Sequence, residues 1–216
     1  MVVHHLEKQK RNIIFIIIGG DIKILILVNK MKEKRKEKNN KIYVSWGKKD
    51  KTGKRDVCDT RLVEAEKMVN YIKNIISLKS KIWCPFDTKE SNIVIALKNN
   101  GYINVINTHI DNDEDFFETE IDCDYIISNP PFQNRTLIFN RLYSFNKPFI
   151  MLQPIQAFNN NSYIRWLIRF NNDIGFLCPN NRMGFIVNGV EKTKTTAFYS
   201  FWHCYKINGV NGFVAI

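Results

Sequence analysis

The chain has 216 residues, of which 44% are apolar, 12% aromatic and 25% charged. This is the composition of one soluble globular domain with a sizeable core, and it excludes a wholly disordered chain and a fibrous repeat. The five cysteines include no Cys-x-x-Cys pair and their number is odd. Neither a zinc site nor a disulfide framework is therefore expected, and reduced thiols in a cytoplasm are the simplest interpretation.

The net charge of +11 belongs entirely to the first quarter of the chain. Residues 1–55 hold 16 Lys or Arg against 5 Asp or Glu, whereas residues 56–216 hold 16 of each kind. We therefore expect a basic, flexible N-terminal extension over 1–55 and a folded domain over 56–216. Such an extension can bind phosphate backbones through counterion release, or it can be a solvated tail without a partner, and the sequence leaves both open.

Two apolar runs within this extension, residues 13–18 and 22–28, are separated by a Gly-Gly-Asp sequence and predict strand, tight turn, strand. Asp21 and Lys23 interrupt the apolar stretch, so no membrane span is expected. Met31 opens the charged run that follows and is expected to be the native start of the protein.

Strand and helix patterns alternate through the remainder of the chain. Short, nearly continuous apolar runs predict buried strands, and apolar residues at helical spacing predict the helices between them. In chain order the expected elements are a helix over 61–77 with Thr60 as its N-cap, a strand over 81–85, a helix over 90–99, a strand over 102–106, an acidic turn over 111–115, a strand over 125–128, a helix over 137–143, a strand over 148–152, a helix over 163–170, and strands over 175–178, 185–187 and 197–207.

This alternation predicts a Rossmann-like α/β fold, with a mostly parallel sheet covered by helices and antiparallel strands closing its C-terminal edge. Ligands of such folds bind at the carboxyl ends of the strands. Four polar residues fall at or just beyond predicted strand ends and are the first candidates for a site: Asp87, His109, Asp115 and Asn129.

The four residues Asn129-Pro130-Pro131-Phe132 directly follow the buried strand predicted over 125–128. The Asn129 side-chain oxygen and the Pro130 carbonyl could accept both hydrogens of an exocyclic amine, which would free the nitrogen lone pair for methylation. The two prolines fix the turn and remove competing N–H donors. Phe132 offers a flat face for a planar base, which a duplex would have to flip out. A proline turn that merely ends a strand is the alternative, and the buried strand before it favours the catalytic interpretation.

The run from Tyr125 to Phe132 resembles the catalytic motif of the N6-adenine methyltransferases. More closely, Trp83-Cys-Pro-Phe-Asp87, Thr108-His-Ile110 and Asp115-Phe-Phe117 resemble a group of small phage-encoded adenine methyltransferase-like proteins, over roughly residues 56–206. The resemblance implies a Rossmann-like S-adenosylmethionine-dependent methyltransferase fold in a phage or prokaryotic host cytoplasm. It also implies direct transfer of a methyl group to the N6 amine of adenine, with nucleic acid as the partner and DNA favoured.

The resemblance further implies which residues form the site. The catalytic residues would be Asn129, Pro130, Pro131 and Phe132. The S-adenosylmethionine pocket would place Pro85 and Asp87 by the methionine part, His109 and Ile110 near the ribose, and Asp115 and Phe116 at the adenine.

Two departures from the family pattern concern the cofactor side. The segment from Asp87 to Ser91 contains no glycine, although a glycine-rich loop usually lets the backbone approach the cofactor. His109 stands where an acidic residue usually binds the ribose, unless Asp111 takes that role. His109 could also be a strand-end histidine that makes one backbone hydrogen bond.

Weaker signals lie towards the C-terminus. Arg165, Arg169 and Arg182 could contact phosphates, and the segments 182–185 and 195–202 could flank the substrate pocket or belong to the core. Fewer than 90 residues follow Phe132, which favours low sequence specificity or recognition through a partner.

Other functions remain open at this stage. The acceptor could be adenine in RNA, or a glutamine amide in a protein, although the glutamine enzymes usually resemble Asn-Pro-Pro-Tyr. A catalytically degenerate methyltransferase fold that binds nucleic acid through its basic extension is the third alternative. The sequence does not indicate an oligomeric state.

Overall fold

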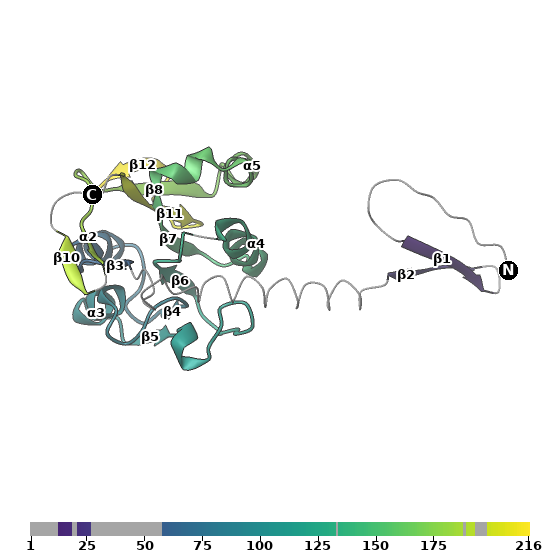
Figure 1. Ribbon diagram of the computed structural model, residues 1–216, viewed down its shortest axis with the longest axis horizontal. Helices are drawn as coiled ribbons and strands as arrows, with labels where there is room; N and C mark the ends of the chain where they lie inside the picture. The colour runs from purple at the N-terminus through teal and green to yellow at the C-terminus, as the bar shows by residue number, and fades with distance from the viewer. Residues whose placement is uncertain (1–12, 19–20, 27–57, 133, 188, 193–197) are drawn as a thin grey trace, which may run out of the picture. The chain divides into compact units, whose positions relative to one another are not determined.

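The structure is a computed structural model that describes residues 13–18, 21–26, 58–132, 134–187, 189–192 and 198–216 (Figure 1). The chain divides into two compact units, Met1–Thr52 and Gly53–Ile216. In the first unit, β1 (Ile13–Ile18) and β2 (Asp21–Ile26) pair antiparallel, as the two apolar runs predict. The lysine-rich stretch after them and Met31 lie outside the described residues.

The second unit is built on a seven-stranded sheet. Its strands are β4 (Lys81–Cys84), β5 (Asn104–Asn107), β6 (Tyr125–Ser128), β7 (Phe149–Pro154), β8 (Ile174–Cys178), β11 (Ser200–Tyr205) and β12 (Gly212–Ala215). Their order in the sheet is β12-β8-β11-β7-β6-β4-β5. Only β11 runs antiparallel to its neighbours within this sheet, so the other six strands are parallel to one another. The predicted Rossmann-like, mostly parallel sheet is confirmed, and the antiparallel strand lies on the C-terminal side of β7.

A second, three-stranded sheet has the order β10-β9-β3, with β3 (Cys58–Thr60), β9 (Phe185–Val187) and β10 (Val190–Lys192) all antiparallel. The expectation that 185–187 closes the edge of the main sheet is therefore wrong. Burial explains the difference, since all six residues of β11 are buried whereas β9 is half-buried after its first residue. β11, which is buried along its whole length, is the strand that lies in the interior of the main sheet beside β7.

Helices cover both faces of the main sheet (Figure 1). On one side lie α2 (Leu62–Ile72) and α3 (Asn92–Asn99), and on the other α4 (Arg135–Phe145) and α5 (Asn161–Arg169). Short 3-10 helices, η1 (Ile110–Asn112) and η2 (Ile155–Asn159), follow β5 and β7. Because side chains alternate along a strand, Ile150 and Leu152 of β7 join the core cluster that contains α2 and α3, while Phe149 packs edge-on against Phe139 of α4. In the described part of the chain, no helix combines the length and apolar character needed to cross a membrane.

The ends of two predicted elements differ from the expectation. Thr60 does not cap α2, because it is the last residue of β3 and pairs with Phe185. Arg61 holds the N-cap position without a side-chain hydrogen bond. Tyr102 precedes β5 instead of starting it. Its ring is buried, and its hydroxyl donates a hydrogen bond to the carbonyl of Ile76 (3.3 Å). In both cases a tertiary contact overrides the local signal.

A buried histidine ties β11 to both helices of its face. His203 is fully buried, and its Nδ1 and Nε2 are 2.6 Å and 3.1 Å from the hydroxyls of Tyr163 and Tyr143. Burial lowers the pKa of His203 to about 3, so the ring is neutral at physiological pH. A neutral imidazole can serve one tyrosine as donor and the other as acceptor, which satisfies both ring nitrogens inside the core.

Gly175 allows the last turn of the chain to pack directly on β8. A Cβ atom at this position would lie 2.2 Å from the backbone oxygen of Val210, which is well inside van der Waals contact. The segment of Val210 leads into β12, so this close approach fixes where the edge strand pairs with β8.

We predict that Gly175→Ala lowers the free energy of unfolding by about 2 kcal/mol or more, because backbone atoms must move to admit the methyl group. Gly209→Asn is the control, since Gly209 has φ +76 and open space around it, and asparagine tolerates that conformation. Chemical denaturation of both variants measures the difference. Equal stabilities for the two variants would contradict the prediction.

Candidate functional site

The carboxyl ends of β4 and β6 bring the two main candidate segments together. Trp83 of β4 pairs with Ile126 of β6, and Ser128 of β6 pairs with Met151 of β7. The loop with Asp87 and the turn that begins at Asn129 therefore emerge side by side from neighbouring parallel strands. This is the edge at which Rossmann-like folds bind ligands.

Asp87 lies at the junction of these two segments. Its side chain is 4% exposed, and its Oδ2 accepts a hydrogen bond from the Ser128 hydroxyl. The Ser91 hydroxyl and the backbone N–H of Asn129 also hydrogen-bond to the carboxyl group. Burial nevertheless raises the pKa of Asp87 to about 7, because desolvation outweighs the stabilisation that these donors give to the charged form. Asp87 thus connects the loop after β4 to the first residue of the Asn-Pro-Pro-Phe turn.

The glycine-free loop after Asp87 is held by hydroxyl groups. The Ser91 hydroxyl accepts a hydrogen bond from the backbone N–H of Thr88 (2.9 Å), and the carbonyl of Thr88 accepts one from the N–H of Ser91 (3.1 Å). Ser91 is also the N-cap residue of α3. The loop is therefore a hydrogen-bonded turn that leads into the helix.

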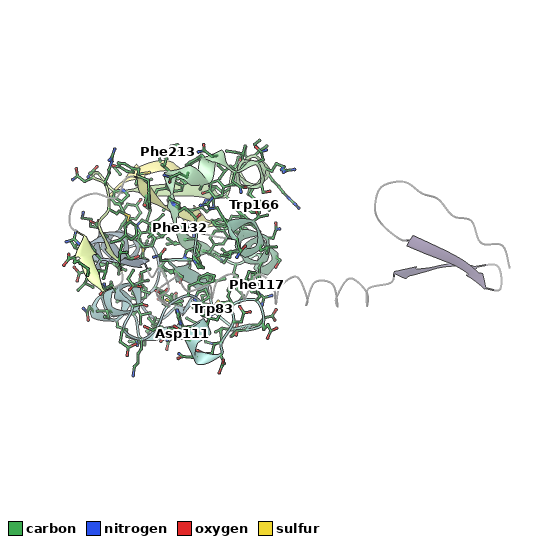
Figure 2. The ribbon with its side chains drawn as sticks, in the orientation of Figure 1. Trp83, Asp111, Phe117, Phe132, Trp166 and Phe213 are labelled. Atoms are coloured by element: carbon green, nitrogen blue, oxygen red, sulfur yellow. The ribbon has the colours of Figure 1, made fainter. Side chains whose placement is uncertain are left out.

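The Asn-Pro-Pro-Phe turn exposes some of its members and buries others. Asn129, Pro131 and Phe132 are partly exposed, whereas Pro130 is buried. The ring of Phe132, labelled in Figure 2, meets the ring of Phe198 edge-to-face at 81°, with centroids 6.4 Å apart. Phe198 belongs to the segment 195–202 that was expected to flank a substrate pocket, and residues 195–197 of that segment lie outside the described part of the chain.

His109 follows β5 and acts as the N-cap residue of η1. Its Nδ1 accepts a hydrogen bond from the backbone N–H of Asp111 (3.1 Å), and its own N–H donates to Glu114 (3.4 Å). The alternative of a strand-end histidine with a backbone hydrogen bond is therefore observed. The side chain is still 24% exposed, and Ile110 beside it is also partly exposed.

Asp59 of β3 is a site residue that the sequence did not indicate. Partial burial raises the pKa of Asp59, and the nearby charge of His109 lowers it. The charge of Asp59 in turn raises the pKa of Asp87. Asp59 therefore lies close to both predicted cofactor residues, although it precedes Asp87 by 28 positions and His109 by 50, and no motif marks it.

Asp115 and Phe116 form a turn that packs against the loop after β4. The ring of Phe116 is 1% exposed and lies 5.7 Å from the ring of Trp83 and 4.7 Å from that of Phe86. Its carbonyl accepts a hydrogen bond from Arg141 Nε (2.8 Å). Phe116 thus anchors the turn and has almost no surface for a ligand, whereas Asp115 and Phe117 remain partly exposed.

The remaining candidates lie apart from this junction. Arg165 and Arg169 are exposed on α5, and Arg182 is exposed between β8 and β9. Pro85 is buried directly after β4. Within the described ranges, no group of three or more His, Cys, Asp or Glu side chains is placed to hold a metal ion.

No protein-family model matches the sequence, and no curated protein matches it. Among solved structures, the chain is similar to a candidate RNA methyltransferase from Pyrococcus horikoshii, at 11% identity over 67% of this chain and 83% of that one, with a TM-score of 0.47. It is also similar to a candidate class I S-adenosylmethionine-dependent methyltransferase from Listeria monocytogenes, at 8% identity over 73% of this chain and 65% of that one, with a TM-score of 0.43. A third is phosphoethanolamine N-methyltransferase 2 from Haemonchus contortus, solved with S-adenosylhomocysteine, at 12% identity over 70% and 39% of the two chains and a TM-score of 0.36.

The fold is defined by the chain's own strand order and strand directions. Six strands in the order β5-β4-β6-β7-β11-β8, with β11 antiparallel among parallel neighbours, form the sheet of the Rossmann-like S-adenosylmethionine-dependent methyltransferase fold. The Asn-Pro-Pro-Phe turn follows β6, which lies directly beside β4, the strand that precedes Asp87.

We predict that Asp87 makes the stability of the protein depend on pH between about 4 and 7. Its pKa is about 7 in the folded protein and about 4 in an unfolded chain, so folding favours the protonated form. The stabilisation is complete below pH 4 and is lost as the pH rises through 7. Asp87→Asn should remove this dependence, which amounts to up to about 4 kcal/mol.

Urea denaturation at several pH values measures this effect as the difference between the wild-type protein and the variant. Asp115 also has a raised pKa and remains in both proteins, so its contribution cancels, whereas Asp59 interacts with Asp87 and the measured difference includes that interaction. The control is Asp113→Asn at an exposed position with φ 59, where asparagine fits equally well. An unchanged pH profile in Asp87→Asn would contradict the assignment.

Proposed function

We propose that this protein is an S-adenosylmethionine-dependent methyltransferase that modifies the exocyclic N6 amine of adenine, with DNA as the favoured acceptor. The observation that carries the proposal is the position of Asn129–Phe132 at the carboxyl end of β6, with Asn129 and Phe132 partly exposed. A proline turn without a chemical role would not need a partly exposed asparagine and a partly exposed phenylalanine at the ligand-binding edge of the sheet.

The chemistry of the acceptor side follows from the turn. The Asn129 side-chain oxygen and the Pro130 carbonyl are the two acceptors for the amino hydrogens, and they draw the nitrogen towards tetrahedral geometry. Phe132 and the ring of Phe198 beside it provide an aromatic corner on which a flipped base can stack. The hydrogen bond from the Asn129 backbone N–H to Asp87 fixes the start of the turn, so the rate depends on positioning and not on a protein nucleophile.

The residues at the ends of β4 and β5 fit S-adenosylmethionine by their chemistry. When bound, this cofactor supplies an electrophilic methyl group on a positively charged sulfur. Asp59 and the His109 ring lie close together, and the carboxylate of Asp59 has no hydrogen-bond donor among the described residues. A carboxylate in that position suits ribose hydroxyls or the cationic part of the cofactor. Asp87 would act beside it through the loop that it holds, together with Pro85, Ile110 and Asp115.

The burial of Phe116 changes one part of this assignment. Its ring packs inside an aromatic cluster and is almost fully buried. We therefore assign the contact with the cofactor adenine to its partly exposed neighbours, Asp115 and Phe117. We assign Phe116 the role of holding that turn in place.

We predict that Asn129→Ala lowers methyl transfer by at least about 100-fold, the usual scale for loss of a positioned polar group in an active site. Cofactor affinity should stay within about threefold, because the hydrogen bond that Asn129 gives to Asp87 comes from its backbone N–H, which the substitution keeps. Asn140→Ala, at an exposed position on α4, is the matched control.

The assay supplies labelled S-adenosylmethionine separately with unmodified DNA, total RNA and a protein extract. Label in DNA adenine that depends on Asn129 supports the proposal. Label in RNA or in protein would move the acceptor to one of the alternative classes. Absence of cofactor binding by calorimetry would exclude all of these enzymatic functions and leave a degenerate fold.

We also predict that deleting residues 1–55 weakens DNA binding and flattens its dependence on salt. These residues carry the whole net charge of +11, and each phosphate contact they make contributes about 0.9 to the slope of log K against log salt. Titration of a labelled duplex at several salt concentrations measures both quantities. Unchanged affinity and slope after the deletion would show that the extension is a solvated tail.

A further inference from the structure

Arg135, the first residue of α4, lies three positions beyond Phe132 and has not been assigned a role by any sequence motif. Its Nε donates a hydrogen bond to Oε1 of Gln153 (2.8 Å). Gln153 is 1% exposed, and its Nε2 donates to the carbonyl of Leu152 (2.6 Å). The buried amide thus holds the guanidinium group in one orientation, while the two terminal nitrogens of Arg135 have no hydrogen-bond acceptor within the described segments.

Arg135 also has no compensating carboxylate among the described residues. It is half-buried, burial lowers its pKa, and the described neighbour that favours its charged form is the Tyr163 hydroxyl. Arg141 on the same helix is buried to a similar extent but is fully partnered, since it donates to the carbonyls of Phe116 and Thr119 and lies 3.7 Å from Glu120. Burying a charged guanidinium without a carboxylate partner costs free energy. An anionic group of a ligand can supply the missing partner.

The strand register places Arg135 at the same rim as the acceptor turn. Ser128 of β6 pairs with Met151 of β7, so Gln153, two residues further along β7, lies level with Pro130. Gln153 pairs on its other side with Phe201 of β11, three residues after Phe198. Gln153, which binds Arg135, therefore lies on a strand whose two neighbours lead to Phe132 and come from Phe198.

We propose that Arg135 binds a phosphate of the acceptor strand next to the target adenine. This assignment rests on the proposed function, because it takes the acceptor to be a nucleic acid. The planar guanidinium offers its terminal N–H groups to a phosphodiester, and Gln153 keeps them aimed at the rim. Arg135 thus positions the strand, whereas Asn129 and Phe132 contact the base.

The test uses the full-length protein and two labelled 12-residue, adenine-rich DNA single strands. One has ordinary phosphodiesters and the other has uncharged methylphosphonate linkages. Binding is measured by fluorescence anisotropy over a range of salt concentrations. The variants are Arg135→Gln and Arg135→Met, the second of which keeps the apolar stem and removes the buried charge. The control is Lys98→Gln at an exposed position on α3.

With the ordinary strand, both Arg135 variants should bind about tenfold more weakly at 0.1 M salt, and the slope of log K against log salt should fall by about 0.7. Lys98→Gln should stay within about twofold of the wild type. With the methylphosphonate strand, the wild type and the Arg135 variants should bind alike. Wild-type affinity and slope in either Arg135 variant would overturn the proposal, and so would an equal loss on both strands, which indicates packing.

The same preparations are assayed for transfer of label from S-adenosylmethionine to the ordinary strand. If the wild type transfers no label but the slope of log K against log salt still falls by about 0.7 in the Arg135 variants, the proposed function fails and the phosphate contact stands. If the wild type methylates the strand and the slope is unchanged in the variants, the phosphate contact fails and the proposed function stands. An equivalent RNA strand distinguishes the two kinds of acceptor.

Discussion

The carboxyl group of Asp87 joins two strand ends that carry different halves of the proposed chemistry. It accepts hydrogen bonds from the Ser128 hydroxyl at the end of β6, from Ser91 at the start of α3, and from the backbone N–H of Asn129. Burying a charged carboxylate costs desolvation free energy. Asp87 reduces this cost in two ways, because it is protonated up to about neutral pH and because these donors hydrogen-bond to its carboxyl group. The position of the Asn-Pro-Pro-Phe turn relative to the loop after β4 therefore depends on one buried side chain. The same hydrogen bonds hold this loop in place although it contains no glycine.

Most of the fold could be predicted from the sequence, because its strands are short apolar runs and its helices carry regular apolar faces. The strand at Tyr125–Ser128 was predicted with the observed bounds, and the edge position of its motif followed from the parallel topology. The place of β9 could not be predicted, since a three-residue run such as Phe185–Val187 fits either sheet locally. Its partner β3 lies more than 120 residues earlier, and only tertiary packing decides between the two.

The site was predictable only where local sequence fixes the chemistry. A proline-rich turn after a buried strand is visible in the sequence, but the approach of Asp59 to His109 depends on the small sheet that holds β3. Phe116 and Phe117 look alike in the sequence, yet one ring is buried and the other is partly exposed. Arg135 gives no sequence signal, because what distinguishes it from Arg141 is that no described carboxylate lies near it in three dimensions.

The insertion of β11 between β7 and β8 has a consequence for the synthesis of this protein. β11 ends at Tyr205, and its six buried residues fill the gap between strands that are complete by residue 178. A chain still growing on the ribosome therefore cannot pair β7 and β8 with their shared neighbour until Tyr205 has been added. The sheet is completed by this long-range pairing, which favours slow, late folding over assembly in chain order during translation.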